Sequence, residues 1–258
     1  MRRGPFGAMK SVDLRRARID AAALASVEEV EFVHLRPTEL LAVDLRKLRG
    51  LSLRHLRSED LQWLQACPKL EVLEVWQSPQ VRSLTGLEHL RKLRWLALWE
   101  LGPLPSLEPV RSLAPVLEEL FLGGGIWKDQ ILGGDYAPLA SLRALRSLTL
   151  TNVRGPADLG PILHLPALCE LTLATGRFPI AEVARVAASY PFWRKTQPWL
   201  RPAEDADGCP RCGSPRWLLL LKGRKKVCCK GCDASRLRRI LEEFDRMVEP
   251  HIAAGRAG

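Results

Sequence analysis

The sequence predicts an α/β-type solenoid in which each repeat adds one short strand to a curved, parallel sheet. The pattern L-x-x-L-x-L, with other apolar residues accepted at its leucine positions, recurs at steps of 18 to 28 residues. Strand alternation turns the fourth and sixth residues of each unit inward and the third, fifth and seventh to the opposite face. The return half keeps an apolar residue at every third position, a spacing that suits 3₁₀ turns. The eight units open at Met9, Val27, Leu48, Leu70, Leu93, Leu117, Leu145 and Leu168.

These units resemble the short-unit subclass of the leucine-rich repeat family over roughly residues 9 to 190. The resemblance implies a right-handed leucine-rich repeat horseshoe with a 3₁₀-like convex side, whose concave sheet binds proteins. Family members usually carry Asn at the ninth position of each unit, whereas this chain has none there, so the backbone groups of those turns need other partners. The ninth positions are Leu56, Ser78, Leu101, Gly125, Val153 and Gly176.

Aromatic side chains gather on the predicted concave face. Trp76, Trp95, Trp99 and Phe121 fall at outward positions of neighbouring strands, which lie about 4.8 Å apart. Exposed tryptophans rimmed by charge are typical of protein-binding hot spots, and here the rim includes Glu74 and Glu119. The unit that opens at Leu117 is the longest, with 28 residues. It adds a glycine-flanked excursion with Trp127 and Tyr136, which we expect to extend the same surface. The alternative is that the chain's own tail, with Phe192, Trp193 and Trp199, covers the patch and makes it core.

Two C-x-x-C pairs predict a structural Zn²⁺ site. Cys209, Cys212, Cys229 and Cys232 have the spacing of a four-cysteine site, in which two tight turns present their thiolates to one tetrahedral ion. The segment resembles the zinc-ribbon family over residues 207 to 234, with strands expected at 216–221 and 226–229. Cys228 could replace Cys229 by a register slip, but Cys229 repeats the two-residue gap of the first pair. Four sulfur ligands leave no open position for catalysis.

The domain boundaries follow from these patterns. Residues 1–190 are expected to form the repeat domain, capped at its C-terminal end by a helix over 180–190. Residues 191–206 are expected to be a linker, 207–234 the zinc ribbon, and 235–250 an amphipathic helix ended by Pro250.

The net charge of +10 lies at the two ends of the chain. This supports an alternative function in which the ribbon hairpin tip and the basic N-terminal arm, with Arg2, Arg3 and Lys10, bind nucleic acid. The candidate contacts at the tip are Lys222, Arg224, Lys225 and Lys226.

Neither catalysis nor membrane insertion is expected. The five histidines belong to no H-E-x-x-H motif, and the sequence has no G-x-S-x-G. Apolar stretches stay well below the roughly 18 residues that span a bilayer. The basic residues Arg2 and Arg3 are not followed by the apolar run of a signal peptide. We therefore expect a cytoplasmic, non-enzymatic protein whose partner is another protein, and the heavy use of Arg, Leu and Ala suggests a bacterial source.

Overall fold

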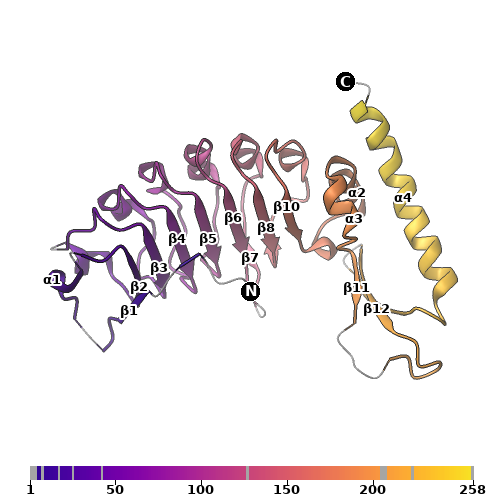
Figure 1. The fold of residues 1–258 in the computed structure, drawn as a ribbon, viewed down its shortest axis with the longest axis horizontal. Helices are drawn as coiled ribbons and strands as arrows, with labels where there is room; N and C mark the ends of the chain where they lie inside the picture. The colour runs from indigo at the N-terminus through magenta and orange to yellow at the C-terminus, as the bar shows by residue number, and fades with distance from the viewer. Residues whose placement is uncertain are drawn as a thin grey trace. The chain divides into compact units, whose positions relative to one another are not determined.

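The structure is a computed structural model that describes residues 5–6, 9–16, 18–24, 26–41, 43–125, 128–203, 208–221 and 224–256. The chain divides into two compact units, which are described separately (Figure 1). The first contains Met1–Pro156 and Leu165–Leu171, and the second contains Ala157–His164 and Thr172–Gly258.

A parallel sheet with one strand per repeat, as the sequence predicts, forms the first unit as far as Leu171, in its last strand, β10. The eight strands follow the order β1-β2-β3-β4-β5-β6-β8-β10. After β1, each strand begins two residues after the opening apolar residue of its repeat. Equivalent positions pair across the sheet, so that Leu51, Leu73, Leu96, Leu120 and Leu148 form one continuous buried row. The strands are β1 (Lys10–Asp13), β2 (Glu29–Val33), β3 (Gly50–Arg54), β4 (Val72–Trp76), β5 (Trp95–Trp99), β6 (Glu119–Gly123), β8 (Ser147–Thr151) and β10 (Glu170–Leu173).

The return half of most repeats contains a short 3₁₀ helix, which confirms the expectation from the three-residue spacing. Val81, Leu84, Leu87 and Leu90 are all buried, and Leu87 lies in the 3₁₀ helix Leu87–His89. The N–H groups of Val81, Leu87 and Leu90 each bond the carbonyl three residues back, as in 3₁₀ turns. A four-residue helix, α1 (Ala21–Leu24), precedes β2. The 3₁₀ helices are Pro37–Leu40, Gln62–Ala66, Leu87–His89, Glu108–Leu113, Ala137–Ser141, Gly160–Ile162 and Thr175–Arg177.

The residues just before consecutive strands form a ladder of alternating charge. The second positions of the units beginning at Val27 run Glu28, Arg49, Glu71, Arg94, Glu118 and Arg146. Neighbouring members are joined through backbone hydrogen bonds, and Arg49 forms an ion pair with Glu71 while Arg94 bonds Glu118. A shift in register would separate each arginine from its glutamate, so the ladder favours the observed register.

The missing asparagines are replaced by polar side chains from two different positions. At a ninth position, the fully buried Ser78 accepts a hydrogen bond from the Leu56 N–H and donates one to the Trp76 carbonyl. Two repeats further on, the Gln130 side chain accepts a hydrogen bond from the Leu101 N–H and donates one to the Gly102 carbonyl. Gln130 comes from the long unit, where β7 (Gln130–Ile131) pairs with β9 (Val153–Arg154) in a small separate sheet.

The second unit combines helices with a three-stranded antiparallel sheet. It contains α2 (Ile180–Ser189), α3 (Pro191–Lys195), β11 (Leu200–Pro202), β12 (Arg216–Leu221), β13 (Arg224–Cys229) and α4 (Ala234–Arg256). Its core holds Trp193, Trp199 and Phe244, with ring centroids 5.7 Å apart for the two tryptophans and 4.5 Å apart for Trp199 and Phe244.

Two predicted boundaries are wrong. The segment 191–206 is not simply a linker, because it contains α3 and β11, and β11 pairs with β12. The terminal helix does not end at Pro250 but continues to Arg256. Proline removes one helical hydrogen bond and crowds the carbonyl four residues before it, but apolar side chains anchor the helix on both sides, with Val248 fully buried before Pro250 and Ile252 half-buried after it.

The predicted end of the repeat domain at residue 190 also differs from the structure. Helix α2, which was expected to cap the repeats, belongs to the second unit and packs against α4. It also contacts the 3₁₀ return at residues 159–162, since Glu182 accepts a hydrogen bond from the Leu159 N–H and the Tyr190 hydroxyl donates to the Ile162 carbonyl. Within the described part of the chain, no helix is both long enough and apolar enough to cross a bilayer.

We expect Gln130→Met to lower the free energy of unfolding by about 2–4 kcal/mol. The methionine has a similar length, but it leaves the buried Leu101 N–H and the Gly102 carbonyl without their partner. Urea denaturation checks this, with the exposed Gln62→Met as the control. A Gln130→Met protein as stable as the control would contradict the bridging role.

Candidate functional site: the aromatic face of the repeat sheet

The third, fifth and seventh positions of the repeats meet on one face of the sheet, as predicted. The third positions of five consecutive repeats, which are the first residues of β2 to β6, form one row of register partners: Glu29, Gly50, Val72, Trp95 and Glu119. In this row a glycine, a valine and a tryptophan lie between two glutamates. Tertiary structure therefore creates an apolar stretch with a carboxylate at each end, from residues that are 90 positions apart in the chain (119 − 29).

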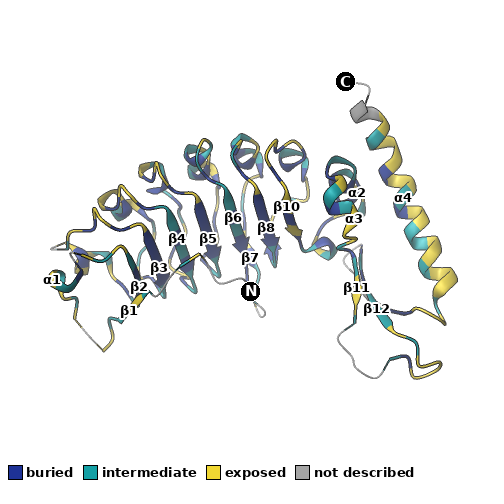
Figure 2. Cartoon of the chain, viewed as in Figure 1, coloured by how far each residue is buried: buried dark blue, intermediate teal, exposed yellow. Residues whose placement is uncertain are grey.

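Three of the four predicted aromatic side chains form one cluster. The Phe121 ring centroid lies 5.4 Å from that of Trp95 and 6.4 Å from that of Trp99. Trp76 is the register partner of Trp99 on the next strand, and the Arg54 guanidinium lies 4.7 Å from its ring centroid. Trp76, Trp99 and Phe121 are each half-buried, so part of every side chain is exposed. Figure 2 colours their strands, β4, β5 and β6, by burial.

Gly123 leaves space for the Trp99 ring. A Cβ atom at this glycine would come within 2.8 Å of the Trp99 Cζ3 atom and 2.7 Å of the Thr151 carbonyl oxygen. The absence of a side chain is therefore a steric requirement of the aromatic cluster.

Trp95 is covered, but not by the segment that the sequence suggested. Only 6% of its surface is exposed, and the ring of Phe6 meets it edge-on with 6.0 Å between centroids. The tail aromatics Trp193 and Trp199 instead pack in the second unit, with Phe244. Trp95 therefore forms the floor of the cluster, and sequence reasoning missed Phe6 because nothing in the repeat pattern relates it to β5.

The face is acidic as well as aromatic. Glu74 accepts a hydrogen bond from Ser52 Oγ at 3.0 Å, and Glu31 pairs with Arg54 at 2.8 Å. Glu119 is half-buried beside Trp95. The outward positions of β2 to β6 hold four glutamates and one arginine, an excess of three negative charges that the overall charge of the chain conceals.

The excursion of the long unit contributes less to this face than expected. Trp127 lies outside the described residues. Tyr136 is fully buried, and this burial raises the pKa of its hydroxyl to about 12. Tyr136 is therefore part of the core and not of the binding surface.

The four predicted metal ligands lie together in the second unit. The Sγ atoms of Cys209, Cys212, Cys229 and Cys232 are all within 4.8 Å of one another. Three of these separations, 3.4, 3.4 and 3.9 Å, are close to the ~3.8 Å expected between sulfurs around a tetrahedral ion. Cys228 is buried opposite Trp217 and is not part of the cluster, so the structure favours Cys229 over the register slip.

The backbone around these cysteines is arranged for thiolates. Gly213 has a φ of 68°, which lets the first turn fold back after Cys212, and the Cys232 N–H donates to Cys229 Sγ. Hydrogen bonds from Ser214 lower the pKa of the Cys212 thiol to about 6. A thiol that ionises readily in a ring of three others is suited to hold a cation.

Comparison with known proteins identifies the architecture. No family model and no curated protein matches the sequence. Among solved structures, an internalin (inlF) from Listeria monocytogenes has a TM-score of 0.51 at 22% identity, covering 66% of this chain and 48% of that protein. The chain has a leucine-rich repeat fold.

A leucine-rich repeat protein of Leptospira interrogans is also similar, with a TM-score of 0.44 and 18% identity, over 69% of this chain and 58% of that protein. The chain thus spans about half the length of the internalin and less than two thirds of the Leptospira protein.

The basic hairpin and a groove are the other polar features of the second unit. Strand β13 begins at Arg224, so the tip is shorter than the predicted 222–225. Lys222 lies outside the described residues, as do the side chains of Arg224, Lys225 and Lys226.

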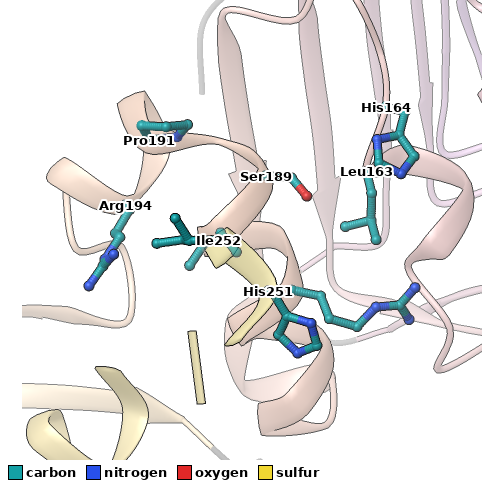
Figure 3. A pocket seen from close by; sticks show the side chains of 10 residues that line it. Leu163, His164, Ser189, Pro191, Arg194, His251 and Ile252 are labelled. Atoms are coloured by element: carbon teal, nitrogen blue, oxygen red, sulfur yellow. The ribbon is translucent and has the colours of Figure 1, made fainter. Parts of the chain in front are cut away.

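A groove of about 700 Å³ is lined by residues of α2, α3 and α4 and by Leu163 and His164, which follow the 3₁₀ helix Gly160–Ile162 (Figure 3). It brings together His164 and His251, which the sequence did not relate. Its two arginines are neutralised by ion pairs, Arg185 with Glu182 and Arg194 with Asp245.

We expect Gly123→Ala to disturb the aromatic face of the leucine-rich repeats. The new methyl group collides with Trp99, so the free energy of unfolding should fall by about 1–3 kcal/mol and the tryptophan emission should shift. Gly176→Ala is the control, because a Cβ there meets nothing closer than 3.9 Å. Equal stability and identical emission of the two variants would show that Trp99 does not rest on Gly123.

Proposed function

We propose that the repeat sheet is the binding surface for a partner protein and that the chain acts without catalysis. The observation that carries this proposal is the group of partly exposed aromatic side chains on neighbouring strands, Trp76, Trp99 and Phe121, with Glu74 and Glu119 on the same face of the sheet. Rigid aromatic side chains in a polar rim dominate the energy of many protein interfaces. Leucine-rich repeat proteins generally mediate such interactions, which agrees with this role.

Zn²⁺ is the metal that we propose for the four cysteines. A tetrahedral all-sulfur site suits zinc or iron, and a closed set of four ligands supplies stability and not chemistry. The ion would hold the two turns before β12 and after β13 together, in a segment with few buried apolar side chains of its own. We also keep the expectation that the protein works in the cytoplasm, where thiols stay reduced.

Nucleic-acid binding by the hairpin stays an alternative prediction. It rests on the four cations of residues 222–226, and a steep loss of affinity with rising salt would support it.

Affinity capture tests the protein-binding role. We expect Trp99→Ala and Phe121→Ala each to weaken partner retention by roughly tenfold or more, since truncating a hot-spot ring typically costs at least ~2 kcal/mol. Met247→Ala, on the exposed side of α4, is the control and should retain the partner fully. A partner held equally by all three variants would mean that another surface binds it.

Metal content tests the zinc site. We expect one zinc ion per purified chain, lost in Cys229→Ser and kept in Cys228→Ser, because only Cys229 joins the sulfur cluster. Elemental analysis gives the stoichiometry, and chelation should lower the melting temperature of wild type but not of Cys229→Ser. Equal zinc content in the two variants would contradict the ligand assignment.

A further inference from the structure

Phe6 occupies a seat on the aromatic face that the repeats leave open. The seat is defined by Gly50, Val72 and Trp95, which are consecutive register partners on β3, β4 and β5. A Cβ atom on Gly50 would lie 3.3 Å from the Phe6 ring, and on the other side the ring meets Trp95. The missing side chain of Gly50 thus provides the space that the ring fills.

Carboxylates border the seat on both sides. Glu29 is the register partner of Gly50, and Glu119 is the register partner of Trp95. Each glutamate lies two strands from Val72, at the centre of the seat, which corresponds to about 10 Å. An extended chain covers that distance in three to four residues.

The sequence around Phe6 is complementary to this surface. Residues 1–10 contain Arg2, Arg3 and Lys10 and no acidic residue, so a cation occurs three or four positions from the phenylalanine on each side. An aromatic side chain between two cations therefore matches, in kind and in spacing, an apolar seat between two carboxylates.

From this match we infer that the aromatic face selects a partner segment with an aromatic side chain flanked by basic residues, and that Phe6 must leave the seat when this segment binds. The inference rests on the proposed binding role of the face and adds the chemistry of the partner. Phe6 is a tethered competitor, because a segment joined to the chain has a high effective concentration at its own seat. The apparent association constant for a partner is then the intrinsic constant multiplied by the fraction of molecules in which the seat is free.

A peptide of residues 1–10 tests the inference on full-length protein. We expect Phe6→Ala protein to bind this peptide about tenfold more tightly than wild type, as follows if Phe6 fills the seat in nine of ten molecules. Adding Gly50→Val should abolish the gain, because the valine side chain fills the place of the ring. Leu41→Ala is the control, since this leucine is exposed elsewhere in the same unit. Isothermal titration calorimetry gives the affinities.

Variant peptides separate the two parts of the recognition. A peptide with Phe6→Ala should not bind, and one with Arg2→Glu and Arg3→Glu should bind more weakly and with little dependence on salt. Acrylamide quenching of tryptophan emission should rise in Phe6→Ala protein and not in Leu41→Ala, which reports the uncovered Trp95 independently of peptide.

Two outcomes would overturn the inference. One is that Phe6→Ala protein fails to bind millimolar peptide, and the other is that Gly50→Val leaves binding unchanged. If either occurs while partner capture still depends on Trp99, the face binds proteins but with a different selectivity. If the peptide binds as expected but partner capture is unchanged in the Trp99 and Phe121 variants, the proposed function is wrong and the assignment of the Phe6 seat is retained.

Discussion

No repeat of this chain can bury its leucines alone, and the rest of the first unit depends on that constraint. The fourth and sixth residues of the units are covered only when the next strand lies beside them in register, as in the row from Leu51 to Leu148. Once the inward residues are aligned, the outward residues are aligned too, since a strand has a period of two. The aromatic face is therefore a by-product of core packing. The Glu–Arg ladder before the strands favours the same register at the edge of the sheet.

Charge and shape on this face are set by the stacking and not by local sequence. Residues 19–189 are almost neutral when summed, yet the outward positions of five strands are acidic and the second positions form a balanced ladder. The result is an apolar seat between carboxylates, complementary to a basic segment with one aromatic ring. That the chain's own Phe6 lies in this seat shows directly that a phenyl ring fits it.

The second unit follows a different logic, because it has no repeats to share a core. Three aromatic rings, Trp193, Trp199 and Phe244, come from α3, the turn before β11 and α4, and together they join the helices to the small sheet. The four clustered cysteines lie at the turns before β12 and after β13. Helix α2 bonds the 3₁₀ return at residues 159–162 and also packs with α4.

The sequence by itself determined the strands, the 3₁₀ returns, the outward positions of Trp76, Trp99 and Phe121, and the four clustered cysteines. These features are local and periodic, so the spacing of residue types is enough to predict them. Only the tertiary structure decided that Phe6 covers Trp95, that Gln130 replaces a missing asparagine, that Tyr136 is core, and that α4 passes Pro250. Each of these depends on a contact between segments far apart in the chain. Such contacts produce no periodic pattern of residue types, so the sequence alone does not reveal them.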